Sequence, residues 1–101
     1  MAAQYANFRE FYPFYLSEHT DRTCRRLHFV GSTLVLLVAA SAIATAHWLW
    51  LLALPVLGYG FAWIGHFFFE KNRPATFTHP FYSFVGDWVM FWQTLTGRIR
   101  F

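Results

Sequence analysis

One long uncharged stretch constrains the fold of this chain more than any other feature. From Leu27 to Phe69, 43 consecutive residues include no Asp, Glu, Lys or Arg. A transmembrane helix needs about 20 mainly apolar residues, so this stretch is long enough to cross a bilayer twice. A short break at residues 45–47 divides it. The pattern predicts one spanning helix over residues 28–45 and a second over residues 48–70.

The composition and the distribution of charge agree with a membrane protein. Apolar residues make up 56% of the 101 residues and charged residues 13%, which is too apolar for an ordinary soluble domain of this size. None of the eight Lys and Arg residues lies between the two predicted spans. Because short loops rich in Lys and Arg stay cytoplasmic, we expect both termini in the cytoplasm, at the inner membrane if the source is bacterial. The net charge of +3 indicates contact with anionic lipid or an anionic substrate, not with nucleic acid.

Two amphipathic segments flank the predicted hairpin. Aromatic residues recur at helical spacing over residues 5–16, where Pro13 interrupts the pattern, and apolar residues do so over residues 81–96. Both segments are too short to cross a bilayer, so we expect them at the membrane interface. For the first segment, packing against the hairpin is an equally good interpretation, and the two are compatible. The sequence therefore predicts an all-α fold with one membrane domain over residues 1–101, a hairpin of two transmembrane helices flanked by two interfacial helices.

Two histidines mark the end of the hairpin opposite its turn. His28 and His66 each lie 19 residues from His47. A turn at His47 therefore brings both imidazoles to nearly the same depth, about 28 Å from the turn at 1.5 Å per residue. Ionisable groups near the end of an apolar segment are functional candidates because burying them is costly. His28 and His66 are accordingly the best candidates for metal ligands, whereas His47 is interpreted as a turn residue.

Three further residues are candidates for the same site. His19 and His79 reach it if the loops that carry them fold inward, and for His19 this requires a helix break near residues 20–22. Glu70, one turn beyond His66, is a candidate either for a ligand or for a partner that fixes an imidazole tautomer. Several neutral imidazoles near one point suit a metal such as Fe(II) or Zn(II). The alternative interpretation is that these histidines bond to lipid head groups, water or backbone.

Basic residues border the same end of the hairpin. Arg25, Arg26 and Arg73 are able to bind a substrate carboxylate, and the simpler interpretation is that they contact phospholipid. The residues alone leave three kinds of protein open. These are a membrane metalloenzyme that acts on a lipid acid, a non-enzymatic small membrane module that binds lipid or a partner, and a metal-binding membrane protein.

Three segments resemble a known family. They are YLSEH at residues 15–19, CRRLHFVG at residues 24–31 and WIGHFFFEKNRPA at residues 63–75. Together they are similar to the small membrane proteins related to the fungal iron(II)-dependent 2-hydroxy fatty acid dioxygenase of fatty acid α-oxidation. The resemblance spans nearly the whole chain, and its most specific part is the pattern Gly-His-x-x-x-Glu-x-x-x-Pro-Ala.

The resemblance implies a membrane-bound non-haem iron dioxygenase that uses O2 to remove one carbon from a 2-hydroxy fatty acid. It implies His19, His28 and His66 as Fe(II) ligands and catalytic residues with Glu70 beside them, and His79 is a less secure match as a fourth ligand. Zn(II) is an alternative metal in a purified sample. The implied partners are a 2-hydroxy fatty acid, O2 and membrane lipid. Because the chain is shorter than the fungal enzyme, a homodimer is one way to complete its pocket.

Overall fold

The computed structural model describes residues 4–101, and residues 1–3 lie outside the described part. Every regular element in this part is a helix, which confirms the predicted all-α fold. The elements are α1 (Phe8–Ser17), α2 (Arg22–Thr45), the 3₁₀ helix η1 (Trp48–Leu52), α3 (Ala53–Ile64), the π-helix η2 (Gly65–Glu70), the 3₁₀ helix η3 (Ala75–Phe77) and α4 (Pro80–Leu95).

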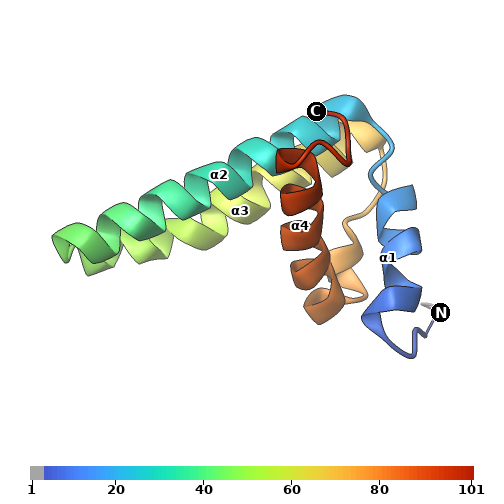
Figure 1. Ribbon diagram of the computed structural model, residues 1–101, viewed down its shortest axis with the longest axis horizontal. Coiled ribbons are helices and arrows are strands. Elements are labelled where there is room, and N and C mark those ends of the chain that lie inside the picture. Colours follow the sequence, from blue (N-terminus) through green and yellow to red (C-terminus); the bar gives the residue numbers. More distant parts are fainter. Residues whose placement is uncertain (1–3) are drawn as a thin grey trace.

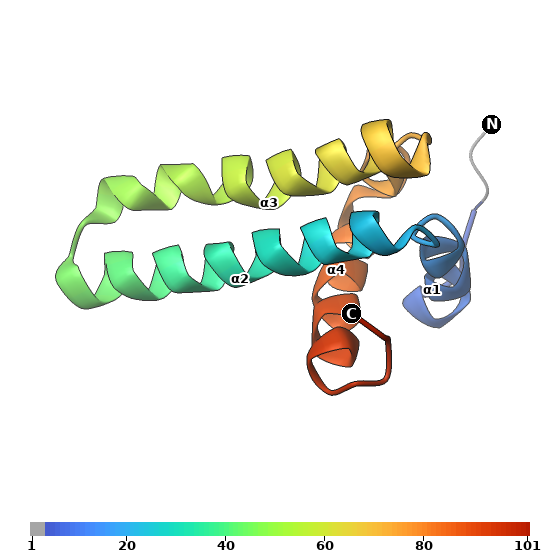
Figure 2. The ribbon, with the colours of Figure 1, turned by 90° about the horizontal axis from the view of Figure 1, so that it is seen from above.

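The predicted hairpin dominates the fold (Figures 1 and 2). Helix α2 runs beside an antiparallel partner made of η1, α3 and η2. The two arms, Arg22–Thr45 and Trp48–Glu70, are each long and apolar enough to cross a membrane. The chain turns where predicted, because Ala46 adopts a left-handed backbone with φ of 57° directly after α2 ends.

Two glycines let the arms of the hairpin approach closely. A Cβ atom on Gly31 would come within 2.9 Å of a side-chain carbon on the facing helix, and one on Gly65 would come within 2.9 Å of Cys24 Sγ. Any larger residue at either position would push the helices apart. Because His66 follows Gly65 and His28 lies one turn beyond Cys24, the second contact sets the spacing between these two histidines.

Helices α1 and α4 lie at the open end of the hairpin and run roughly perpendicular to it (Figures 1 and 2). They pack on each other through a core whose buried residues are Phe11, Tyr15, Ala75 and Met90. Gly86 permits this approach, since a Cβ there would lie 3.0 Å from the Tyr15 ring. The segments predicted over residues 5–16 and 81–96 are therefore helices, and they cover only one end of the hairpin.

Several boundaries differ from the sequence prediction. Helix α1 continues through Pro13, which removes only one N–H donor, while residues on either side of it are buried in the aromatic core. Helix α2 begins at Arg22, six residues before the predicted start, because the Asp21 carboxylate accepts a hydrogen bond from the Cys24 amide at 3.0 Å and caps the helix. The π-helical turn at Gly65–Glu70 was not predicted. Such turns inside α-helical segments frequently occur at functional sites.

Candidate metal centre

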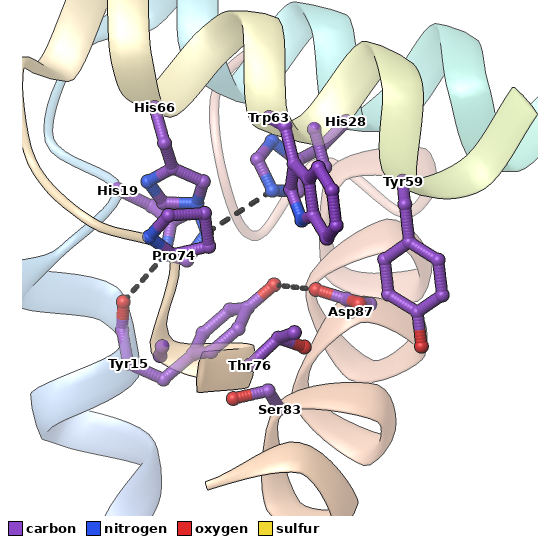
Figure 3. A pocket seen from close by; sticks show the side chains of 12 residues that line it. Tyr15, His19, His28, Tyr59, Trp63, His66, Pro74, Thr76, Ser83 and Asp87 are labelled. Carbon is purple, nitrogen blue, oxygen red and sulfur yellow. Dashed lines mark hydrogen bonds between the residues drawn. The ribbon is translucent and has the colours of Figure 1, made fainter. Parts of the chain in front are cut away.

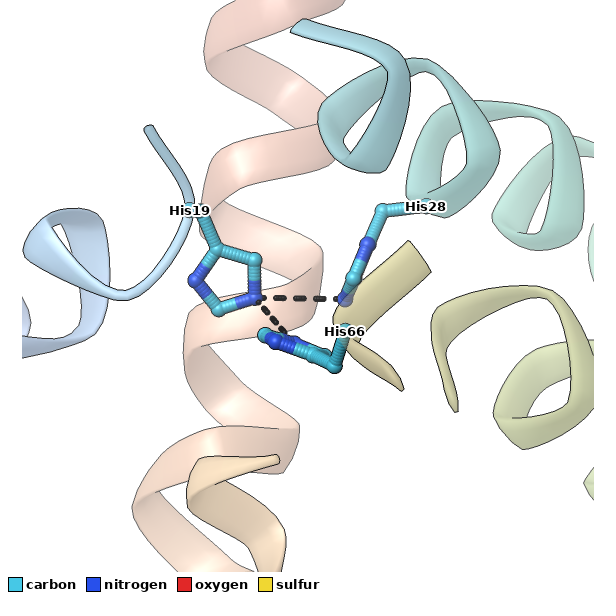
Figure 4. A group of neighbouring side chains, drawn as sticks. All are labelled: His19, His28 and His66. Atoms are coloured by element: carbon cyan, nitrogen blue, oxygen red, sulfur yellow. Dashed lines mark hydrogen bonds between the residues drawn. The ribbon is translucent and has the colours of Figure 1, made fainter. Parts of the chain in front are cut away.

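Three histidines from three different elements meet at the open end of the hairpin (Figure 4). His19 lies in the loop between α1 and α2, His28 on α2 and His66 on η2. The Nε2 atom of His19 lies 2.9 Å from Nε2 of His66 and 3.2 Å from Nε2 of His28. All three side chains are buried, with at most 6% of their surface exposed. One nitrogen from each ring can therefore reach a single small ion.

The outer nitrogens of His19 and His28 fix which nitrogen carries the proton. His19 Nδ1 donates to the Tyr15 carbonyl at 2.6 Å, and His28 Nδ1 donates to the Cys24 carbonyl at 2.9 Å. A carbonyl oxygen only accepts hydrogen bonds, so in both rings the proton is on Nδ1. Each neutral ring then carries a lone pair on Nε2.

His66 is oriented in the same way by a side chain. Its Nδ1 donates to Asn72 Oδ1 at 2.7 Å, while Asn72 Nδ2 donates to the carboxylate of Glu18 at 2.7 Å and to its carbonyl at 3.1 Å. These two donations settle which end of the amide faces His66. The structure thus directs three Nε2 lone pairs toward one point, an arrangement that suits a cation between them. Metal-binding histidines almost always donate their other N–H to an oxygen in this manner.

The environment keeps the histidine of the loop neutral. The pKa of His19 lies well below its usual value because burial disfavours the imidazolium form and because His28 and His66 lie close by. The Tyr15 ring stacks on the His19 ring with their centroids 4.1 Å apart. Since a metal binds the neutral imidazole, the site is in its ligating form without the loss of a proton.

A small cavity, here called the histidine pocket, lies in front of the three rings (Figure 3). It has a volume of about 10 Å³, room for about one water molecule. Across it from the histidines, the Tyr15 hydroxyl donates to the Asp87 carboxylate, and the buried Ser83 hydroxyl has no partner among the described residues. Burial raises the pKa of Asp87 to about 7. Burial and the neighbouring Asp87 carboxylate together raise the pKa of Tyr15 well above its usual value. The pocket therefore has one wall of metal-binding nitrogens and one of hydroxyl and carboxyl groups.

The protein family described as 2-hydroxy-palmitic acid dioxygenase Mpo1-like matches residues 5–99. The chain belongs to the Mpo1-like family. This match confirms the resemblance found in the sequence, and it includes all three converging histidines. No curated protein and no solved structure matches the chain.

The structure places the two other candidate ligands of this Mpo1-like chain outside the group of three. Glu70 accepts hydrogen bonds from the Asp21 amide and, at 3.3 Å, from the Thr20 hydroxyl. It therefore ties the end of η2 to the loop that carries His19. His79 lies half-buried among the aromatic rings of Tyr5, Phe11 and Phe14, and its Nδ1 is 2.8 Å from the hydroxyl of Thr78. The three-histidine group contains neither residue.

The three arginines predicted to bind substrate have different surroundings. Arg25 donates from Nη1 to the His19 carbonyl at 3.2 Å and so holds the loop that carries this ligand. Arg26 donates from Nε to the Phe101 carbonyl at 3.2 Å. The guanidinium of Arg73 lies over an aromatic ring of η3, beside a larger surface pocket. None of the three lines the histidine pocket.

Tyr15, Asn72 and Asp87 were not predicted from the sequence as parts of this site. Asp87 carried a usable signal, because it is the one acidic residue in the apolar pattern of residues 81–96. Asn72 lies within the third family-like segment but outside its most specific positions. Tyr15 was one of several aromatic residues at helical spacing, and it also opens the first family-like segment, YLSEH at residues 15–19. Its role depends on the position of its carbonyl, which only the fold shows.

Proposed function

We propose that this chain is a membrane-bound non-haem iron dioxygenase that removes one carbon from 2-hydroxy fatty acids. The observation that carries the proposal is the convergence of three buried Nε2 atoms whose rings are all oriented through Nδ1. Membership of the Mpo1-like family supplies the reaction class. The reaction converts a 2-hydroxy acid and O2 into the acid one carbon shorter, carbon dioxide and water.

The donor set fits the proposed metal. Imidazole nitrogen suits Fe(II) as well as Zn(II), and three protein ligands leave further coordination positions open. When bound there, Fe(II) supplies O2 activation and a point at which the hydroxyl and carboxylate of the substrate can both bind. His19, His28 and His66 are the proposed ligands. Glu70 is proposed to hold the His19 loop in place through its bonds to Thr20 and Asp21, directly before α2 begins.

The polar wall of the histidine pocket has a proposed role of its own. Substrate hydroxyl and carboxyl groups at the histidines would face the paired Tyr15 and Asp87 and the unpartnered hydroxyl of Ser83. The pocket, at about 10 Å³, would have to widen to admit the head of the substrate, and these groups are then placed to orient it. Among the arginines, Arg73 is the best candidate for attracting the carboxylate, because Arg25 and Arg26 already donate to backbone carbonyls.

The membrane location is also part of the proposal. Only 17% of the most apolar window in each hairpin arm is buried, whereas the core helix of a soluble protein would be mostly buried. With the hairpin across a bilayer, the perpendicular α1 and α4 would lie along one membrane face (Figure 1). The absence of Lys and Arg between the arms favours a cytoplasmic location for that face and for both termini.

Metal analysis combined with oxygen uptake tests this function. The protein, purified without oxygen and loaded with Fe(II), should bind one iron per chain. It should consume O2 with a 2-hydroxy fatty acid and release one CO2 for each O2. The fatty acid without the hydroxyl group is the matched control and should not react. Bound metal without O2 uptake would favour a metal-binding membrane protein, and absence of both would favour a non-enzymatic module.

A further inference from the structure

An apolar groove leads away from the histidine pocket along the hairpin. Residues of α2, α3 and α4 line it, and its volume is about 370 Å³, within the range of about 300–1,000 Å³ that is typical of small-molecule sites. His28, Ala62 and Asp87 line both the groove and the histidine pocket. The two spaces therefore adjoin each other, and a molecule whose polar head lies at the histidines is placed to extend past these side chains into the groove.

The lining of the groove becomes apolar with distance from the histidines. Asp87 and His28 stand at the pocket end, and Val35, Leu54 and Pro55 line the other end. Ala62 and Leu54 are eight residues apart, which corresponds to about 12 Å along the helix. This polarity matches a ligand with a polar head at the histidines and an apolar tail.

We propose that this groove binds the alkyl tail of the 2-hydroxy acid and that Gly58 keeps it open. The proposal rests on the proposed function for the identity of the ligand. Gly58 lines the groove between Ala62 and Leu54, and a Cβ atom there would touch only Val35, at 3.5 Å. The space above Gly58 is thus open and not filled by helix packing. A large side chain at this position would fill the middle of the groove.

The contacts of the other glycines favour this path over one between the two hairpin arms. Gly31 and Gly65 bring α2 and its partner arm so close that a single added carbon would lie 2.9 Å from the facing side chain. An alkyl chain cannot pass through such a contact without separating the helices. The groove beneath α4, where Phe84 and Trp88 face the hairpin, is open instead.

A pair of matched glycine variants tests the proposal. Gly58→Leu should lower the ratio of kcat/KM for a long-chain 2-hydroxy acid to that for a short water-soluble one by about tenfold or more, with iron content unchanged. Gly60→Leu is the control, since Gly60 lies on the same helix but a Cβ there meets no atom within 4 Å. It should keep the ratio of the wild type. An unchanged ratio in Gly58→Leu would overturn the proposal.

A milder variant covers the case in which Gly58→Leu does not fold. Gly58→Ala adds one carbon at an ordinary van der Waals distance from Val35, so the helices should keep their packing. It should lower the same ratio by a smaller factor. If it folds and leaves the ratio unchanged while Gly58→Leu fails to bind iron, the groove is not the site of the tail.

Photo-crosslinking gives a readout that does not depend on turnover. A 2-hydroxy acid with a diazirine near the end of its tail should label the region of Leu54 and Pro55 in the wild type and in Gly60→Leu, but not in Gly58→Leu. Equal labelling of the groove by a phospholipid with the same group would overturn the proposal. Labelling without O2 uptake would reject the oxygenase function and keep the tail site. O2 uptake with labelling outside the groove would reject the tail site and keep the oxygenase function.

Discussion

The two ends of the hairpin both carry histidine, and among the residues that the structure describes only one end gathers them into a group. At the turn, His47 is exposed, stacks on Trp50 with ring centroids 4.6 Å apart and pairs its Nδ1 with the Thr45 hydroxyl at 2.7 Å. At the open end, His28 and His66 are buried, their Nδ1 atoms bond to fixed oxygens and their Nε2 atoms face a common point. The residue type is the same at both ends. The difference is made by burial, by the oxygen that orients each ring and by the helices that cover one end alone.

Alanine substitutions should separate the two ends most strongly. His28→Ala and His66→Ala should each abolish bound iron and O2 uptake, because loss of one of three strong donors removes affinity and geometry together. His47→Ala should retain both, since its ring stacks on Trp50 and bonds to Thr45, both far from the three-histidine group. Elemental analysis of each purified variant measures the effect. A full complement of iron in both of the first two variants would show that the metal binds elsewhere.

Chemical labelling should place the two ends on opposite sides of the membrane. A thiol introduced by His47→Cys should react with an impermeant reagent applied from outside, and one introduced by Arg100→Cys should be protected. The native Cys24 is buried and should give little background. The expectation follows from the distribution of Lys and Arg around the spans. Reaction of position 100 from outside would invert the topology and move the histidine pocket to the outer face.

The sequence predicted the architecture well because the signals for it extend over many residues. The apolar run predicted the hairpin and its turn, and helical spacing predicted α1 and α4, with errors of a few residues at their ends. The hydrogen bond from the Cys24 amide to the Asp21 carboxylate, which caps α2 and starts it before the predicted residue, was not predicted, although Asp is a common N-cap residue. Such boundaries depend on single hydrogen bonds, which a periodic pattern does not show.

The site was predictable only in part. Equal spacing from the turn brought His28 and His66 together, position alone made His19 and His79 further candidates, and the resemblance to the family favoured His19. The π-helical turn that carries His66 and the oxygens behind each ring depend on long-range contacts, as between Asn72 and Glu18. No pattern within one segment encodes such a contact. For the same reason the sequence did not show that Glu70 and His79 lie outside the group of three.

A pH-dependent contribution to stability should also belong to the open end alone. The pKa of Asp87 rises from 3.8 to about 7 on folding, because burial disfavours the charged carboxylate. The folded metal-free protein therefore binds this proton more tightly than the unfolded chain, and the free energy of unfolding should fall as pH rises from about 4 to 7. Asp87→Asn should remove this fall. At pH 8 we expect the variant to be more stable than the wild type by about 2 to 4 kcal/mol.

The comparison between variant and wild type is needed because other groups titrate in the same range. The lowered pKa of His19 makes the free energy of unfolding rise with pH below about 6.5, which opposes the effect of Asp87. Thermal unfolding of both metal-free proteins in detergent, at pH 5 and pH 8, isolates the contribution of Asp87. A stability difference that is the same at both pH values would show that this carboxyl group does not titrate between them.

The smallest expected effect concerns the partner that orients one ligand. Asn72→Ala removes the acceptor of the His66 Nδ1–H and both donations to Glu18, while the three Nε2 donors remain. Loss of such an outer partner typically weakens metal binding by about 10- to 100-fold, so iron should still bind at saturating concentration. Arg73→Ala, at the next position, is the matched control and should leave iron affinity unchanged, because its guanidinium contacts an aromatic ring of η3. Competition with a chelator measures both affinities. Equal iron affinities for Asn72→Ala and Arg73→Ala would mean that packing alone orients His66. The orienting oxygen would then no longer distinguish the open end of the hairpin from the turn.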